Sequence, residues 1–371
     1  MKIGVLTGGG DCSGLNAVIR AVTKSAMYHF GWQVVGIQDG FQGITSQPPN
    51  VHVLDLHEVS GILDRGGTIL GASNRGDPFN YPMHDEDGKP LLDEEGKQIR
   101  QDISDRLAEN MRSLGIKALV VVGGDGTMRL ANRLHVEKGM NIVGVPKTID
   151  NDLGGTDITF GFNTATQIVT DATDRLHSTA ESHHRVMIIE TMGRYAGHIA
   201  LNAGLAGGAD IILIPEIEWT VEKVAAVIKE RRRMGRRHTI ITVGEGAKPK
   251  GGQLVTHGKL VEDSVIAERL GGIGHWLREA LEDLIDLEVR VTVMGHTQRG
   301  GTPTAFDRNL GTLLGHAAVL AVHDKKFGQM VAIQGTQIVT VPLDLASRTR
   351  PVDPDSEAVR AARGTMVSFG D

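Results

Sequence analysis

The chain has 371 residues, a formal net charge of −6 and one cysteine. Its length allows two domains that each bury a core, and its acidic balance supplies no basic face for a nucleic-acid backbone. A single cysteine cannot form an internal disulfide, no apolar run approaches the ~20 residues of a membrane span, and the first residues lack the order of a signal peptide, so we expect a cytoplasmic protein with neither nucleic-acid nor membrane partners.

Short apolar runs rich in β-branched residues recur along the chain, each followed by a glycine turn and a segment of helical spacing. Runs that are apolar at every position are typical of parallel strands covered on both faces. The sequence therefore predicts an α/β fold of two doubly wound parallel-sheet domains, with an active-site cleft between them beyond the carboxyl ends of the strands. The predicted strands are Ile3–Leu6, Val34–Ile37, Leu119–Val122, Ile142–Val145, Val186–Ile189, Ile211–Ile214, Ile240–Val243 and Val291–Met294.

Two regions depart from this alternation. The segment 78–104 is acidic, poor in branched apolar residues and contains the turn pairs DG and EG, so we expect a surface insertion built as a hairpin. From about residue 340 the prolines are spaced to stop regular structure before a short last helix. The basic run 231–238 is either a solvated helix end or an anion site.

Two glycine-rich junctions follow predicted strands. The first, LTGGGDCSGLNAVIR, places Gly8, Gly9 and Gly10 before a helix start, where free N–H groups can face a phosphate. The second, VVVGGDGTMRLANRL, places Asp125 among glycines, where a carboxylate beside bound phosphates suits Mg²⁺. Neither is a Walker loop or a GxGxxG motif, so each is a weak signal by itself. Cys12 is either a reactive thiol or a small residue that fits its turn.

The third junction, GVPKTIDND, carries charged side chains directly after an apolar run. Phosphoryl transfer needs a base for the acceptor hydroxyl and positive groups for the migrating charge. Asp150 and Asp152 are candidates for the base, and Lys147 and Thr148 are candidates for stabilising the charge. Because Asp and Asn also favour ordinary turns, a plain strand end is the alternative interpretation.

Arginines gather in segments that we expect to be loops. Arg185, Arg194, Arg290 and Arg299 lie outside the predicted helix surfaces, and His296 lies close to the last of them. A planar guanidinium group binds two phosphate oxygens at once. Any one of these arginines alone is more typical of a surface salt bridge, but together with His296 they indicate a pocket for a second phosphorylated molecule.

With these motifs in order, the chain resembles the ATP- or pyrophosphate-dependent phosphofructokinase family. The resemblance runs from Gly4 to about Gly315 through GGGDCSGLNAVIR, GGTILGASNR, GGDGT, PKTIDND, MGRYAG, GGADIILIPE and GHTQRGGTPTAFDR. The wording of GGGDCSGLN and PKTIDND is most similar to the mixed-substrate group, whose members divide between the two donors. The resemblance implies a phosphotransferase that phosphorylates fructose 6-phosphate at its 1-hydroxyl in glycolysis, giving fructose 1,6-bisphosphate.

The resemblance also implies roles for individual residues. The ATP donor would be bound by Gly10, Arg75, Gly124, Asp125, Gly126 and Thr127, with Asp125 on Mg²⁺. Asp150 would be the general base, and the other catalytic residues would be Thr148, Asp152 and Arg194. The sugar phosphate would be held by Thr148, Ile149, Asp150, Arg185, Met192, Gly193, Arg194, Glu245, Arg290, His296, Thr297, Gln298 and Arg299. Because GASNR carries one residue more than the shortest family versions, Arg75 could be displaced from the donor.

On the same resemblance, residues 1–161 with about 298–345 would form the donor-binding domain, and 162–297 with the tail would form the sugar-phosphate domain. Members of the family exchange the equivalents of Arg185 and Arg290 between neighbouring subunits. We therefore expect a homodimer or homotetramer with shared sites.

The choice of donor depends on two positions that disagree. Pyrophosphate users of the family carry an acidic side chain at the position of Gly126, where it fills and repels the space of the nucleotide α-phosphate. They also carry a lysine at the position of Lys147, which this chain has. We give Gly126 more weight, since a blocked site is decisive and an added cation suits either donor, so ATP is expected and pyrophosphate is the alternative. A NAD or lipid kinase sharing GGDGT is a remote alternative, because such enzymes do not need TIDND, MGR and HTQRGG in series.

Overall fold

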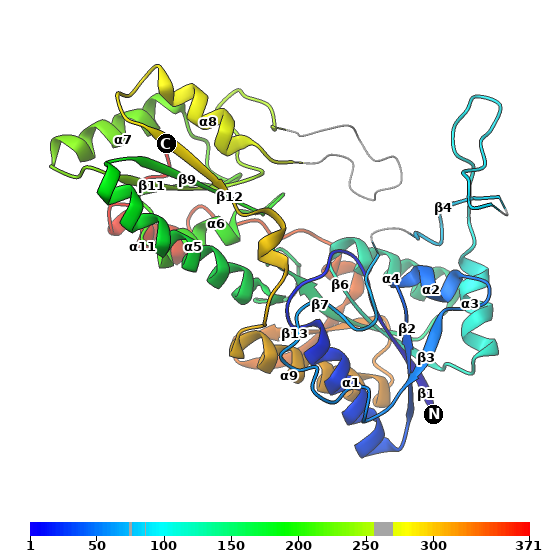
Figure 1. Ribbon diagram of the computed structural model, residues 1–371. Helices are drawn as coiled ribbons and strands as arrows, with labels where there is room; N and C mark the ends of the chain where they lie inside the picture. Colours follow the sequence, from blue (N-terminus) through cyan, green and yellow to red (C-terminus); the bar gives the residue numbers. More distant parts are fainter. Residues whose placement is uncertain (74–75, 86, 256–269) are drawn as a thin grey trace.

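Two sheets organise the computed structural model, which describes residues 1–73, 76–85, 87–255 and 270–371 (Figure 1). The larger sheet has the strand order β14-β13-β7-β6-β1-β2-β3, with β8 paired to β7. Its inner strands are parallel, and the antiparallel pairs β2–β3 and β13–β14 close its two edges. The strands are β1 Lys2–Thr7, β2 Gln33–Ile37, β3 Val51–Leu54, β6 Ala118–Gly123, β7 Ile142–Thr148, β8 Phe160–Gly161, β13 Gln329–Gln334 and β14 Gln337–Pro342.

Helices cover both faces of this sheet, which explains why its inner strands are apolar at every position. On β1, Ile3 and Val5 join a core formed with α1 and α9, whereas Leu6 joins a core formed with α2, α3, α4 and α10. The helices are α1 Leu15–Phe30, α2 Phe41–Thr45, α3 Ser104–Ser113, α4 Asp125–Lys138, α9 Ala305–His323 and α10 Leu343–Ala346.

The smaller sheet is parallel in the order β10-β11-β9-β12. Met187 and Ile189 of β9 face the core that contains α5, α6 and α11, and Val186 and Ile188 face α7 and α8. The strands are β9 Val186–Thr191, β10 Ile211–Leu213, β11 Thr239–Gly244 and β12 Val289–Val293. The helices are α5 Phe162–His183, α6 His198–Ala206, α7 Val221–Arg233, α8 Ile273–Glu282 and α11 Glu357–Gly364, and η1 Gly295–Arg299 is a 3₁₀ helix.

Every predicted strand is present, and the α/β class with two helix-covered sheets is confirmed. The insertion contains an antiparallel pair, β4 Tyr81–Pro82 with β5 Arg100–Gln101, as expected of a hairpin. Among the described residues, no helix has both the length and the apolar composition that crossing a membrane requires. Strands β3, β8, β13 and β14 were not predicted, and Arg290 lies within β12 instead of in a loop.

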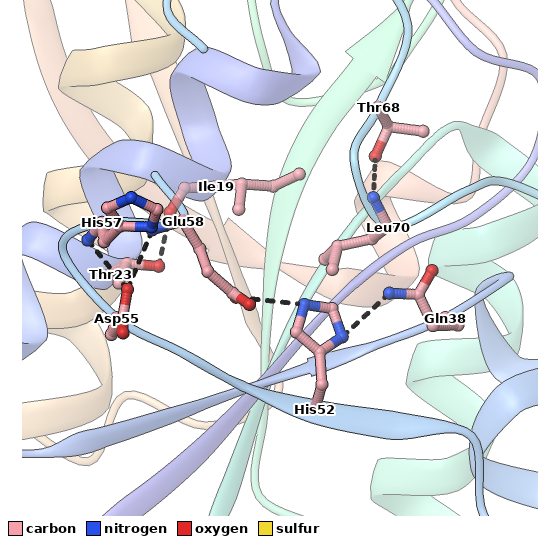
Figure 2. Close-up of polar contacts among 9 residues, drawn as sticks. All are labelled: Ile19, Thr23, Gln38, His52, Asp55, His57, Glu58, Thr68 and Leu70. Atoms are coloured by element: carbon pink, nitrogen blue, oxygen red, sulfur yellow. Dashed lines mark hydrogen bonds and ion pairs between the residues drawn. The ribbon is translucent and has the colours of Figure 1, made fainter. Parts of the chain in front are cut away.

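The edge strand β3 is held by polar side chains (Figure 2). Gln38 Nε2 donates to His52 Nδ1 at 2.9 Å, and His52 Nε2 lies 3.3 Å from Glu58 Oε2. Asp55 Oδ1 accepts from the backbone N–H groups of His57 and Glu58, both at 2.8 Å, which closes the turn after the strand. The following chain is thereby directed back toward the end of β1, where the first glycine-rich loop begins.

Candidate active site

The loops after β1 and β6 lie face to face at the carboxyl edge of the larger sheet. Gly8 N donates to Val122 O at 2.8 Å. A Cβ on Gly8 would lie 2.8 Å from Thr127 Cγ2, and one on Gly123 would lie 2.4 Å from the same atom. Only glycine allows this approach around the buried Thr127, so the main chains of both predicted donor loops are brought together.

Asp125 is the first residue of α4, not part of a loop, and Gly124 precedes it as the N-cap. Its Oδ2 lies 3.6 Å from Arg129 Nη2, and the side chain is 45% exposed, so carboxylate oxygen remains accessible at the positive end of the helix. In the described part of the chain, no cluster of three or more His, Cys, Asp or Glu side chains can hold a metal ion unaided. An ion on Asp125 would therefore need further oxygens from bound phosphates.

Lys147 lies near the end of β7, which runs three residues past the predicted strand to Thr148. Its side chain is buried, and Nζ donates to the carbonyl oxygen of Gly10. Burial lowers the pKa of Lys147 below its usual value. This lysine therefore joins the third junction to the first.

Asp150 and Asp152 follow the strand in a turn where Asn151 has φ 53°. Asn151 Oδ1 accepts from Thr159 N at 2.9 Å, and Thr148 Oγ1 accepts from Asp150 N at 3.0 Å. Asp150 Oδ1 is buried and has no hydrogen-bond partner among the described residues. The turn therefore holds a carboxylate oxygen ready to accept a hydrogen bond from a ligand.

Burial is the main reason why both carboxyl groups have raised pKa values. The pKa of Asp150 is raised by burial against the opposing charges of Arg299 and Lys147, with Asp125 adding to the rise. The pKa of Asp152 is raised to about 7, first by burial and then by the charges of Asp150 and Asp125. Three carboxylates thus share one electrostatic environment, which a bound cation would relieve.

Each sheet with its covering helices forms one lobe, and the smaller lobe contributes the chain after β9 and β11. Gln298 Oε1 accepts from Met192 N at 3.3 Å, and Glu245 N donates to Thr191 O at 2.9 Å. Burial raises the pKa of Glu245 to about 7, with the charge of Asp150 as the second cause. Arg194 Nε is buried without a partner among the described residues. Glu245, which is predicted to hold the sugar, therefore lies in the same electrostatic environment as the predicted base.

Arg299 contacts the larger lobe directly. It is the last residue of η1, and its Nη1 donates to Asp11 O at 3.0 Å. A Cβ on Gly10 would lie 2.7 Å from the same nitrogen. His296 and Thr297, on the same short helix, are exposed. The guanidinium group of Arg299 is thus placed against the first glycine-rich loop.

One chain does not bring together the four arginines of the predicted phosphate pocket. Arg185 precedes β9 and Arg290 lies at the start of β12, whereas Arg194 follows the other end of β9. The six residues of β9 separate these ends by about 17 Å. Arg185 Nε and Arg290 Nη2 instead both contact the carboxylate of Glu288, and the hydrogen bond from Arg185 lowers the pKa of that group.

Some buried polar residues near the site were not predicted. Glu190 accepts from Gly272 N and Gly274 N, both at 2.8 Å, and thereby anchors the start of α8. Its position at the carboxyl end of an apolar run was the available signal. Cys12 is buried with its pKa raised to about 12, which favours a fitting small residue over a reactive thiol. Arg75 lies outside the described residues.

The chain is similar to proteins of known activity. Residues 2–322 match the family described as "Phosphofructokinase". "ATP-dependent 6-phosphofructokinase 2" of Clostridium perfringens is 50% identical over 100% of this chain and 98% of the relative. "Pyrophosphate--fructose 6-phosphate 1-phosphotransferase" of Streptomyces coelicolor is 48% identical over 95% of this chain and 97% of the relative.

Among solved structures, Pichia pastoris phosphofructokinase in the T-state matches with a TM-score of 0.77 and 30% identity, over 98% of this chain. This chain spans 36% of that longer protein. A pyrophosphate-dependent phosphofructokinase from Marinobacter aquaeolei matches with a TM-score of 0.76 over 99% of this chain and 91% of its own. Because the identity is only 21%, this second match supports the fold alone.

Proposed function

The chain belongs to the phosphofructokinase family, and from that premise we propose that it is a 6-phosphofructokinase that transfers the γ-phosphoryl group of ATP to the 1-hydroxyl of fructose 6-phosphate. The observation that carries the proposal is the buried Asp150 Oδ1, which lacks a partner among the described residues beside two cations, Lys147 and Arg299. A neutral turn residue would not need this environment.

In the proposed reaction, Asp150 accepts the proton of the 1-hydroxyl as the sugar oxygen bonds to the γ-phosphorus and the bridging bond to the β-phosphate breaks. The main-chain N–H groups at the start of α4 would bind the donor phosphates. Arg194 and Arg299 would stabilise charge on the migrating group and the sugar phosphate. Thr148 and Asp152 would orient the acceptor, because they flank the base in the same turn.

Mg²⁺ fits the donor side of this site. Asp125 has an accessible carboxylate and lies in the same electrostatic environment as Asp150 and Asp152, so an added cation offsets like charges there. When bound with the donor, Mg²⁺ would neutralise phosphate charge. Asp125 would hold it, together with oxygens of the donor itself.

ATP is favoured over pyrophosphate as the donor. Gly126 is the second residue of α4 and places no side chain beside the donor loops. Lys147, which pointed to pyrophosphate, is buried and already bonded to Gly10 O, so its presence is accounted for by the link between two loops. The curated relatives of similar identity include users of both donors by name.

We also propose how the two domains and the subunits share the substrates. Residues 1–161 with about 298–345 would bind the donor, and 162–297 with the tail would bind the sugar phosphate. Arg185 and Arg290 would serve the site of a neighbouring subunit, because one chain holds them at the far end of β9. The enzyme would work in the cytoplasm, where its glycolytic substrates occur.

A coupled assay with fructose 6-phosphate tests the reaction and the donor together. The wild-type chain should show a higher kcat/KM with ATP than with pyrophosphate. Gly126→Asp should abolish ATP use by crowding and repelling the α-phosphate, and it should leave measurable activity with pyrophosphate, which has no third phosphate. A wild-type preference for pyrophosphate would overturn the choice of donor, and turnover of NAD or a lipid instead of the sugar would overturn the reaction.

A further inference from the structure

The C-terminal strap, residues 347–352, crosses from the larger lobe to the smaller one. In Figure 1 the orange chain of β13 continues into red at α11, which lies beside the smaller sheet. Leu153 forms an antiparallel bridge with Thr349, and Gly154 N donates to Arg348 O at 2.9 Å. A Cβ on Gly154 would lie 3.1 Å from Arg348 O, so the turn that carries Asp150 and Asp152 runs directly against the strap.

The side chain of Arg350 forms two hydrogen bonds with the turn 151–157, which follows Asp150. Its Nη2 donates to Asn151 O at 3.1 Å and to Asp157 O at 2.8 Å. Its backbone N–H donates to Asp152 O at 2.6 Å. One residue of the strap therefore binds three carbonyl groups of the turn 151–157, and two of these bonds need the fixed geometry of a guanidinium nitrogen.

The same strap is bonded to the smaller lobe. Arg350 O lies 3.2 Å from Nε2 of His198, the first residue of α6. Val352 N donates to Glu216 Oε1 at 2.7 Å, and that oxygen also accepts from Gly197 N at 2.9 Å. Gly197 and His198 follow Arg194 closely in the chain, so the strap reaches the sugar-binding loop as well as the catalytic turn.

From these contacts we infer that Arg350 is a positioning residue for phosphoryl transfer, which acts by holding the turn of Asp150 and Asp152 in register with the loop of Arg194 on the other lobe. The inference rests on the proposed function. Arg350 touches neither the base nor the proposed substrate groups through its side chain. Its loss should therefore impair the chemical step more than the binding of fructose 6-phosphate.

Three variants test this: Arg350→Ala, Arg350→Lys and, as a matched control, Arg348→Ala. Arg348 lies two positions earlier, and its 70% exposed side chain meets Asp344 at 3.6 Å. Arg350→Ala should lower kcat by about 10- to 100-fold, since small misplacements of reacting groups have effects of that size. The KM for fructose 6-phosphate should change by about twofold or less, because the sugar contacts stay. Lysine should not restore kcat, and Arg348→Ala should match the wild type.

Chemical rescue separates positioning from general loss of structure. Millimolar guanidinium chloride should raise the kcat of Arg350→Ala and leave Arg348→Ala unchanged, whereas methylammonium chloride should have no effect, because it lacks the planar donor pair. The inference is overturned if Arg350→Ala keeps its kcat, if kcat falls only with the folded fraction seen by circular dichroism, or if guanidinium fails to rescue it.

Hydrogen exchange provides a measurement that does not require turnover. Amides of residues 150–159 should exchange faster in Arg350→Ala than in Arg348→Ala, because the turn loses the two hydrogen bonds from the Arg350 side chain. Unchanged exchange there contradicts the strap's role even in an active enzyme. A wild-type chain without activity toward fructose 6-phosphate would contradict the proposed function instead, and the exchange comparison would still decide whether Arg350 holds the turn.

Discussion

The carboxyl groups at the end of β7 combine burial with mutual repulsion. Asp152 is 8% exposed, and Asp150 has a buried oxygen without a partner among the described residues. Such groups destabilise the fold when they are charged, unless a ligand supplies compensating hydrogen bonds or positive charge. This is the arrangement expected of a general base whose pKa is raised by burial.

Replacing the base separates turnover from binding. Asp150→Asn should lower kcat by roughly 10²–10⁴, because the amide keeps the shape of the side chain and cannot accept the hydroxyl proton. The KM for fructose 6-phosphate should change far less. Steady-state kinetics with a coupled assay measure both. Turnover near the wild-type value would remove Asp150 from this role.

The ionisation of Asp152 makes the stability of the fold depend on pH. Its pKa is about 7 in the folded chain, whereas an aspartate in the unfolded chain has a pKa near 3.8. Between these pH values the folded chain therefore binds more protons than the unfolded chain. Its contribution to the free energy of unfolding therefore falls as pH rises through this window, and the loss is complete above about 7. Asp152→Asn keeps a neutral side chain, so it should raise Tm at pH 8 but not at pH 4.

Thermal melts of Asp152→Asn and of Asp171→Asn, an exposed aspartate on α5, make the comparison. The control should shift Tm little at either pH. An equal gain for Asp152→Asn at both pH values would show that its effect comes from packing, not from ionisation.

At the scale of elements, η1 shows how one turn of helix serves two loops. Gln298 is buried and accepts a hydrogen bond from Met192 N of the smaller lobe, while Arg299 extends to Asp11 O of the larger lobe. The helix therefore fixes the sugar-binding loop on one side and the donor loop on the other. Its exposed His296 and Thr297 directly precede these two residues in the sequence.

Removing Arg299 should act mainly on the sugar phosphate. A charge-assisted hydrogen bond contributes about 1.5–3 kcal/mol, so Arg299→Ala should raise the KM for fructose 6-phosphate by about 10- to 100-fold. Arg308→Ala is the control. Arg308 lies on the following helix, α9, and its Nε donates to Pro303 O at 2.9 Å. A rise in the KM for ATP alone would contradict the assignment.

At the scale of the whole molecule, the strands of the smaller sheet are parallel, so their carboxyl ends and their amino ends lie on opposite sides of the sheet. Arg194 follows the carboxyl end of β9, and Arg185 precedes its amino end. A side chain cannot span the strand, so in the proposed enzyme Arg185 and Arg290 would complete the phosphate site of another subunit. A symmetric dimer would then contain two shared sites.

Mixing two inactive variants tests this sharing. Asp150→Asn retains Arg185, and Arg185→Ala retains Asp150, so a mixed dimer forms one site with both residues intact. Random reassortment should restore about a quarter of the wild-type activity at subsaturating fructose 6-phosphate. Mixing Asp150→Asn with Asp150→Asn,Arg185→Ala is the control and should restore nothing. Equal activities before and after mixing of the complementary pair would place both residues in one chain's site.

The local sequence was sufficient for β1, β2, β6 and β7 of the larger sheet, for every strand of the smaller sheet, and for the residues at their carboxyl ends. Inner strands are covered on both faces, so they appear as continuous apolar runs, and the glycines and charges that follow mark the edge where ligands bind. The edge strands β3 and β14 were missed because most of their residues are exposed or only partly buried, and a polar residue, His52 or Thr340, interrupts each apolar run.

The remaining features depend on chain segments that are distant in sequence. Lys147 meets Gly10 across 137 positions, and Arg350 meets Asn151 across 199. No local pattern encodes such partners, because they are set by the order and register of strands in the folded sheet. The same register separates Arg185 and Arg290 from the carboxyl edge. Residue types and their spacing therefore indicated the chemistry, while the folded chain determined which of those residues one active site can use.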